Sequence, residues 1–248
     1  MREKRSQAPG TPSSGKAAAQ ASFLAQSDIF RHLDPAEIGE LERIVTVISC
    51  APGRILYRPG ETGNVLFLLK TGRVQLYHLS ADGRKLITAT LAAGACFGEM
   101  PLIGQGMHSG FAEAVEESLI GVMNRHDVEH VLARKPSVAL ALLKVVGARL
   151  AQIEAQLIDA TFKSTSARLA TLLLQLARSP EGKGERLVVD GLSHEELAER
   201  LGVYRETVST ALRELREAGA IELGRKHITI SEPALLADLA APGYWGGR

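Results

Sequence analysis

The sequence predicts an α+β protein in which an antiparallel β-domain precedes one long helix and a small C-terminal helical domain with a β-hairpin. Three observations predict this order. Short strand-like runs separated by glycine-bearing turns fill residues 45–123. Apolar residues at coiled-coil spacing follow within residues 136–162. Near the end lie two amphipathic helices, joined only by Gly202-Val203-Tyr204, and two short strands.

Length, composition and charge are those of an ordinary soluble globular protein with two modest domains. The chain has 248 residues, of which 45% are hydrophobic, and a net charge of +1. The sequence has no run of about 18 apolar residues, so we expect no membrane span. Residues 1–22 are rich in Pro, Ser, Gly and Ala and have no apolar core. This segment is therefore predicted to be a disordered arm and not a secretory signal.

The cysteine content excludes two classes of protein. Cys50 and Cys96 are the 2 cysteines of the chain. They are too few for a four-thiolate iron–sulfur cluster within one chain, and they do not make a disulfide-rich secreted scaffold. We expect buried, reduced thiols in a cytoplasmic protein.

The β-domain is predicted over residues 23–135 and begins with helical spacing up to about residue 45. Asp34 can cap a helix that has Pro35 at its first position. The strand-like runs that follow are RILYRPG, NVLFLLKTG, RVQLYHLS, KLITATLAAG and SLIGVM. Asp82-Gly83, between two of these runs, is a strong hairpin signal. Such regular repetition of strand and turn indicates an antiparallel sandwich or barrel.

A long helix is predicted over residues 136–162. Apolar residues recur along it with alternating steps of four and three, which is the seam of a coiled coil. The predicted seam residues are Val146, Leu150, Ile153 and Leu157. A seam on a long helix needs a partner, and a second copy of the chain is the most economical one. We therefore expect a homodimer with these residues at its interface. In the alternative, the stripe packs on the β-domain of its own chain.

The C-terminal domain is predicted over residues 163–240, and its centre is a pair of amphipathic helices. Ser193 and Glu196 form a capping-box pattern at the start of the first helix. Gly202 tolerates the left-handed conformation that ends a helix. The residues expected to face inward are Leu197, Ala198, Leu201, Val208, Leu212 and Leu215. With two short strands around Gly224-Arg225-Lys226, this pattern is typical of a winged helix-turn-helix.

The outer face of the second helix is polar and predicts contact with double-stranded DNA. An exposed helix of this kind fits the major groove, and its first residues meet base edges. Arg205 can donate to guanine, Glu206 can accept from cytosine, and the wing can contact phosphates. The predicted DNA-binding residues are Tyr204, Arg205, Glu206, Thr207, Ser209, Thr210, Arg213, Arg225 and Lys226. In the alternative, this is the solvated face of an ordinary helical hairpin.

The order of β-domain, seam helix and winged helix-turn-helix resembles the bacterial cyclic-AMP receptor protein/fumarate-nitrate regulator family over about residues 23–236. The run YRETVSTALREL resembles the Arg-Glu-Thr-Val signature of that family's recognition helix. In the family, the Arg and Glu read a half-site, and an Arg four residues after the Glu reads a guanine. Arg205 and Glu206 match this pattern, whereas Thr210 stands at the third position. Tyr204 cannot cap the helix as the family's Ser or Thr does, although its phenol can reach a phosphate.

The resemblance implies a fold and a function. The fold is a jelly-roll effector domain like that of cyclic-nucleotide-binding proteins, followed by a dimerisation helix. The function is that of a transcription regulator. Members of the family are more often activators than repressors, and an activator contacts RNA polymerase. An enzyme is not expected, because no Ser-His-Asp arrangement, metal-binding cluster or phosphate loop stands out. A regulatory module of a channel or kinase is disfavoured, because the sequence shows no kinase region and no membrane region.

The runs PGETGNVLFLLKTGRV and GACFGEM resemble the family's cyclic-nucleotide-binding fold and its phosphate-binding cassette. The effector pocket that this implies contains Gly98, Glu99, Ser109, Gly110, Ile153 and Glu154. In nucleotide binders the Glu takes the ribose hydroxyl and an Arg-Ser or Arg-Thr pair takes the cyclic phosphate. Ser109-Gly110 stands in place of that pair, and Ile153-Glu154 in place of the Thr-Ser that faces adenine.

The missing Arg removes an anion anchor, and a buried Glu beside a cyclic phosphate would repel it. We therefore expect that cyclic AMP is not the effector and that the protein has no cofactor. Two possibilities stay open: a regulator without a small-molecule effector, and one gated by a different ligand.

Haem is one such ligand. The run MHSG, Met107–Gly110, resembles the segment that holds the haem-ligating histidine of the family's carbon-monoxide sensor, so His108 is a candidate iron ligand. That protein has a Cys two residues before its His, where this chain has Gly106. Since lone loop histidines are more often solvated or hydrogen-bonded than metal-bound, we do not expect haem.

Overall fold

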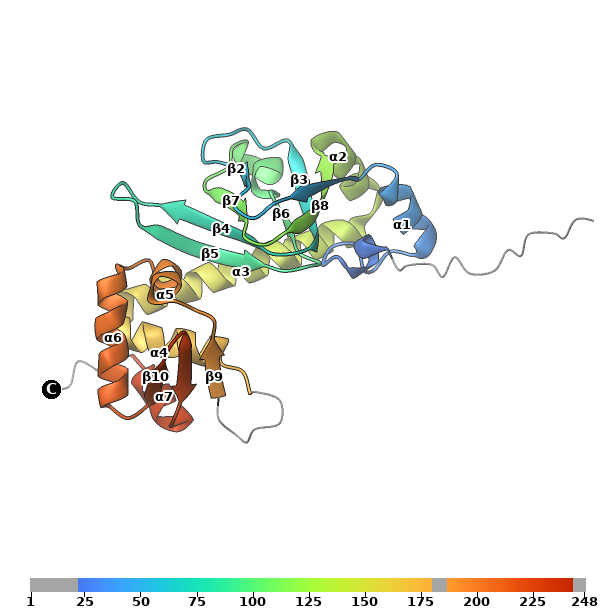
Figure 1. Ribbon diagram of the computed structural model, residues 1–248. Helices are drawn as coiled ribbons and strands as arrows, with labels where there is room; N and C mark the ends of the chain where they lie inside the picture. The colour runs from blue at the N-terminus through green and yellow to red at the C-terminus, as the bar shows by residue number, and fades with distance from the viewer. Residues whose placement is uncertain (1–21, 180–186, 243–248) are drawn as a thin grey trace, which may run out of the picture.

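The computed structural model describes residues 22–179 and 187–242 (Figure 1). The predicted arm lies outside the described residues except for Ser22, and so do residues 180–186. A β-domain lies at one end, a long helix runs beneath it, and a smaller domain sits at the far end of that helix (Figure 1). None of the helices in the described segments is long and apolar enough to cross a membrane.

Two antiparallel four-stranded sheets form the β-domain. The first has the order β1-β8-β3-β6, with bounds Thr46–Cys50, Ser118–Asn124, Val65–Thr71 and Cys96–Phe97. The second has the order β2-β7-β4-β5, with bounds Ile55–Tyr57, Phe111–Ala114, Val74–Leu79 and Lys85–Leu91. Side chains from both sheets meet in a shared core that includes Phe67, Phe97, Leu69 and Ala112. The predicted β-sandwich is confirmed.

The strand-like runs in the sequence predict only part of these sheets, because they leave out β1, β6 and β7. Strand β6 is two residues long, and β7 reads Phe-Ala-Glu-Ala, so neither has a strong strand pattern of its own. Pairing decides both: β6 is held by Phe67 and Leu68 of β3, and β7 lies between β2 and β4. Both residues of β6 are fully buried.

Short helices cover the ends of the β-domain. They are η1 (Phe23–Gln26), α1 (Pro35–Glu42), the π-helical turn η2 (Pro101–Gln105) and α2 (Arg125–Arg134). The predicted cap of α1 is confirmed, because the Asp34 carboxylate accepts from the Glu37 amide at 2.8 Å and Glu37 accepts from the Asp34 amide in return. The predicted hairpin at Asp82-Gly83 joins β4 to β5.

Helix α3 (Pro136–Phe162) has its fully buried residues only in its first two turns. Val138, Ala141 and Leu142 are buried there against Leu66 and Met123. Val146 is partly buried, whereas the other seam residues are open: the exposed fraction is 57% for Leu150, 50% for Ile153 and 66% for Leu157. The alternative in which the whole stripe packs on the β-domain is therefore wrong.

The C-terminal domain has four helices and a three-stranded sheet among its described residues. The helices are α4 (Thr165–Leu176), α5 (His194–Leu201), α6 (Arg205–Glu217) and α7 (Pro233–Leu239). The strands β9 (Leu187–Asp190), β10 (Ile221–Gly224) and β11 (His227–Ile230) form an antiparallel sheet of order β10-β11-β9. The predicted wing is the hairpin β10–β11. Helix α7 has no counterpart in the sequence prediction.

Candidate DNA-binding surface and effector cavity

The turn between α5 and α6 orients the second helix. Gly202 ends α5 with φ +66°, the left-handed conformation that side chains with a Cβ disfavour. At the other end of α5, Ser193 and Glu196 form the predicted capping box. The carbonyl of Leu201 accepts from the Arg168 guanidinium of α4, so the end of α5 is fixed from a third helix.

One face of α6 is fully buried and the other is open. Val208, Leu212 and Leu215 are each 0% exposed in the core of the domain. A hydrogen bond from the Ser166 hydroxyl to Glu214 adds a polar tie between α4 and α6. The opposite face of the helix is therefore turned outward (Figure 1).

The predicted reading residues lie on that outward face. Arg205, Glu206, Thr210 and Arg213 are exposed, and Thr207 and Ser209 are partly exposed. No ion pair within the described residues engages Arg205 or Arg213, so both guanidinium groups keep their donors for another molecule. The arrangement is the one that a major-groove helix requires.

Ser209 is held by a residue that the sequence analysis missed. Its hydroxyl lies 3.0 Å from Nδ1 of His194 and donates to the Arg205 carbonyl at 3.1 Å. His194 comes from the first turn of α5, so it positions a side chain on the next helix. Its fifteen-residue separation from Ser209 carries no local sequence signal.

The wing presents the predicted basic pair. Arg225 and Lys226 are exposed at the β10–β11 turn, and Lys226 adopts φ +54°. The Gly191 amide donates to the Lys226 carbonyl at 2.9 Å, and His227 contacts the Asp190 carboxylate. The turn is therefore braced by the end of β9.

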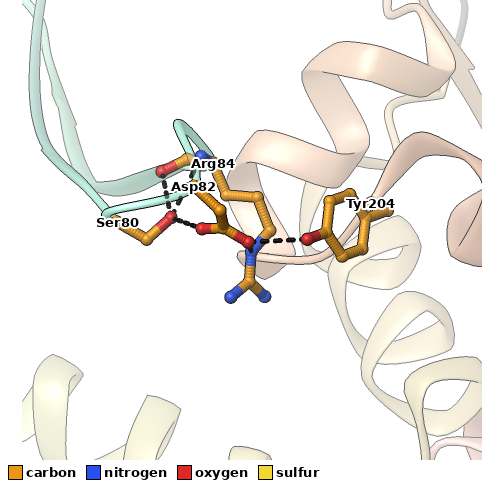
Figure 2. A network of polar contacts seen from close by, with 4 residues as sticks. All are labelled: Ser80, Asp82, Arg84 and Tyr204. Carbon is orange, nitrogen blue, oxygen red and sulfur yellow. Dashed lines mark hydrogen bonds and ion pairs between the residues drawn. The ribbon is translucent and has the colours of Figure 1, made fainter.

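Tyr204, which is 52% exposed, links the start of α6 to the β-domain. It stands at the N-cap of α6 without capping it, as the sequence predicts. Its hydroxyl donates to Asp82 on the β4–β5 turn at 2.6 Å (Figure 2). This acceptor raises the pKa of the Tyr204 phenol.

A cavity of about 370 Å³ lies between the β-domain and α3. Five predicted effector residues line it: Gly98, Glu99, Ser109, Gly110 and Ile153. Glu154, the sixth predicted residue, does not line this cavity and is exposed. The residues of α3 that reach the cavity include Val146, Arg149 and Ile153, and Glu154 is one helical position, about 100°, beyond that face.

The cavity contains an ion pair whose cation the sequence analysis missed. Glu99 is 2% exposed, and its carboxylate contacts the guanidinium of Arg149. Arg149 also donates to the Cys96 carbonyl. One sequence signal points to Arg149, because it lies four residues before Ile153 and so on the same face of α3. The charge of Glu99 is neutralised before any ligand enters.

Stacked aromatic rings form part of the wall. The rings of Tyr57 and His108 are 3.6 Å apart and nearly parallel, and those of Tyr77 and Phe111 are 5.0 Å apart. Burial lowers the pKa of His108 and raises the pKa of Tyr57, and burial together with Glu113 raises the pKa of Tyr77 to about 12. These groups are therefore uncharged at neutral pH.

No group of three or more His, Cys, Asp or Glu side chains that could hold a metal ion occurs in the described parts of the chain. Cys50 and Cys96 are free and buried, as expected. Burial raises the pKa of Cys96 to about 12, so it is a neutral thiol.

Comparison with known proteins gives matches for both domains. Residues 47–135 match the family model of the cyclic nucleotide-binding domain, and residues 167–239 match that of the Crp-like helix-turn-helix domain. The chain is 32% identical to the cyclic AMP receptor protein of Thermus thermophilus, over 86% of this chain and 97% of that protein. It is 30% identical to the CRP-like cAMP-activated global transcriptional regulator of Mycobacterium tuberculosis, over 88% of this chain and 98% of that protein.

Among solved structures, FixK2 from Bradyrhizobium japonicum matches with a TM-score of 0.65 and 26% identity, over 80% of this chain and 98% of that chain. These matches run through the β-domain, α3 and the C-terminal domain together. The curated relatives are transcription regulators and not enzymes.

The cavity ion pair gives a testable prediction. Replacing Arg149→Met leaves the Glu99 carboxylate buried without its partner, and we expect the free energy of unfolding to fall by about 3 kcal/mol. The double variant Arg149→Met/Glu99→Gln removes the stranded charge and is expected to recover most of that loss. Urea unfolding followed by circular dichroism measures both. Equal losses in the single and double variants would contradict this account, because the loss would then not come from the stranded Glu99 charge.

Proposed function

Because the chain belongs to the CRP/FNR family of DNA-binding transcription regulators, we propose that it acts as a homodimer that reads an imperfect palindrome with α6 of each copy. The observation that carries this is the two-sided construction of α6. Its apolar face is fully buried, and its polar face, with Arg205 and Arg213 unpaired among the described residues, is exposed. Charge placement and not total charge supports DNA binding, since the net charge of the chain is only +1.

We assign base reading to the first turns of α6 and phosphate contact to the wing. Arg205 and Glu206 are exposed at the start of the helix, where base edges are met. Arg225 and Lys226 are exposed on the wing and suit the adjacent backbone. Thr210, in place of an Arg, offers a hydroxyl and a methyl group, so readout at that base pair differs from the family pattern.

Dimerisation is supported by the uncovered stripe on α3. Leu150, Ile153 and Leu157 are each at least half exposed on one side of a long helix. A stripe of this kind is costly in water, and pairing with the same stripe of a second copy removes it. Pairing also places two α6 helices for successive major grooves, about 34 Å apart.

We propose further that cyclic AMP is not the effector, although two relatives are named for it. Arg149 is the only Arg or Lys side chain that lines the described cavity, and Glu99 already neutralises it. A cyclic phosphate therefore finds no uncompensated cation. The wall of the cavity is mostly apolar and partly aromatic, which favours binding of an uncharged small molecule. Control by such a molecule is therefore favoured over a regulator that has no effector.

Activation of transcription, contact with RNA polymerase and a cytoplasmic location are also part of the proposal. Their support is the family membership alone, because activation is the commoner mode that the resemblance implies. His108 as a haem ligand is not favoured, because the ring is stacked on Tyr57 and lies within the wall of the cavity.

Base reading predicts that Arg205→Ala weakens binding to the selected site by about 1–3 kcal/mol, because a bidentate contact to a base edge is lost. Fluorescence anisotropy with a duplex selected from a random pool measures the affinity. Arg134→Ala, at an exposed position on the β-domain, removes the same charge and should have little effect. Equal affinities of Arg205→Ala and wild type would remove Arg205 from the reading surface.

The dimer interface predicts that Leu157→Glu yields a monomer, because two carboxylates would face each other across the seam. Analytical ultracentrifugation gives the oligomeric state, and anisotropy gives the accompanying loss of affinity for the palindrome. Val47→Glu is the control, because Val47 is 44% exposed and lies on strand β1, outside α3. This variant adds the same charge and should stay dimeric. A Leu157→Glu protein that stays dimeric would contradict the assigned interface.

The cavity charges predict that cyclic AMP at millimolar concentration leaves the DNA affinity of the wild type unchanged. Ser109→Arg restores an anion anchor, and this variant should bind cyclic AMP more tightly than the wild type in a calorimetric titration. An increase of wild-type DNA affinity on adding cyclic AMP would refute the proposal. An absorbance scan of the purified protein tests haem in the same preparation.

A further inference from the structure

The β4–β5 turn reaches from the effector domain to the start of the proposed reading helix (Figure 1). The turn is internally rigid. The Ser80 amide donates to the Arg84 carbonyl at 2.9 Å, the Arg84 amide donates to the Ser80 hydroxyl at 3.0 Å, and the Ser80 hydroxyl contacts the Asp82 carboxylate. Arg84 Nε donates to the same carboxylate at 2.9 Å. The Asp82 carboxylate is thus oriented before it meets its partner.

The partner is Tyr204, the residue directly before the first turn of α6. Its hydroxyl donates to Asp82 at 2.6 Å, and the Arg84 guanidinium lies 4.9 Å from the centre of its ring (Figure 2). The hydroxyls of Ser80 and Tyr204 and the Arg84 guanidinium lower the pKa of the Asp82 carboxyl, so this group is an anion at neutral pH. The contact is a charge-assisted hydrogen bond between two domains.

Two further contacts join the hairpin to the same turn. Lys85 lies 3.6 Å from Glu199 of α5, and both side chains are largely buried. Leu86 packs against Gly202, where an added Cβ would meet it at 3.0 Å. The hairpin therefore contacts the end of α5, the turn and the N-cap of α6.

The contact competes with DNA in two ways. The N-terminal end of a helix carries partial positive charge and, in a groove-reading helix, lies beside phosphates. Asp82 places a carboxylate there, which repels phosphate, and the hairpin that carries it occupies the space beside the start of α6. The Arg84 charge does not reverse this effect, because Arg84 is paired with Asp82 itself.

The contact is also weak enough to release. The side chains of Asp82 and Arg84 are 43% and 41% exposed, and Tyr204 is 52% exposed. Exposed charged contacts contribute little net stability, in contrast to the fully buried core of the C-terminal domain. A few such contacts can hold the two domains in the arrangement seen here and still allow them to separate when DNA binds.

We propose that the β4–β5 turn is a latch in which Asp82 holds Tyr204, keeps the reading helix against the β-domain and competes with DNA phosphate for the start of α6. The inference rests on the assignment of α6 as the DNA-reading helix. The latched state and the DNA-bound state exclude each other, so the fraction of latched protein lowers the apparent DNA affinity. Opening the latch restores that affinity.

Two variants test the latch from opposite sides. Tyr204→Phe removes one hydroxyl and no charge, and Asp82→Ala removes the acceptor without altering the C-terminal domain. We expect each to bind the selected duplex about fivefold more tightly, because one net hydrogen bond is lost from the closed state only. A direct phosphate contact by Tyr204 gives the opposite sign, so unchanged or weaker binding by Tyr204→Phe would overturn the latch.

Controls separate the latch from a general charge effect. Glu42→Ala, at an exposed position in α1, changes the net charge as Asp82→Ala does and should leave the affinity nearly unchanged. The double variant Asp82→Ala/Tyr204→Phe should gain no more than either single variant, because both break the same bond. The proposal would be contradicted if the double variant gained the product of the two single gains in DNA affinity. It would also be contradicted if Glu42→Ala gained as much affinity as Asp82→Ala.

A second readout needs no DNA. In hydrogen-exchange mass spectrometry of the full chain, the amides at 80–84 and 202–206 should exchange faster in Tyr204→Phe than in wild type, while those of β3 and β8 stay unchanged. Unchanged exchange at both segments would contradict the latch. A wild-type protein that selects no duplex at all would instead defeat the assignment of α6, whatever the exchange data show.

Discussion

The burial of one face of α6 is the constraint on which the arrangement of the C-terminal domain depends. Val208, Leu212 and Leu215 leave no exposed surface, so the rotation of the helix about its axis is set by its apolar side chains. Gly202 then sets where the helix begins, because its left-handed backbone turns the chain within three residues. Arg205, Glu206 and Thr210 face outward as a consequence and require no interaction of their own to do so.

Helix α3 divides its length between two tasks. Val138, Ala141 and Leu142 anchor it to the β-domain, and the stripe from Leu150 to Leu157 remains uncovered. Between these regions Arg149 forms an ion pair with Glu99, so the helix also supplies the cation that neutralises the buried carboxylate of the cavity. One helix therefore contacts the cavity wall, carries the proposed dimer seam and leads into the DNA-binding domain.

The β4–β5 hairpin connects the same regions by a second route. Leu76, Tyr77, Thr88 and Ala89 of its strands line the cavity, whereas its turn contacts the start of α6. The antiparallel ladder between the strands makes the hairpin a continuous element. The same hairpin thus lines the cavity with its strands and contacts the N-cap of α6, the proposed reading helix, with its turn.

The sequence by itself determined the elements whose signals are local. Capping at Asp34 and Ser193, the turn at Asp82-Gly83, the glycine turn and the apolar spacing of α3 and α6 all act within a few residues, and each is present in the structure. Most of the predicted DNA-facing residues are exposed for the same reason, because helical periodicity decides the face on which a side chain lies.

Only the tertiary structure decided which distant groups meet. Arg149 and Glu99 are 50 residues apart, and Tyr204 and Asp82 are 122 residues apart. The strands β6 and β7 likewise depend on neighbours supplied by other parts of the chain. Pattern and propensity describe a segment, whereas a partner across the fold is set by how whole elements pack. For that reason the sequence includes Glu154 among the cavity residues, which the described cavity does not, and gives no sign of the contact between Tyr204 and Asp82.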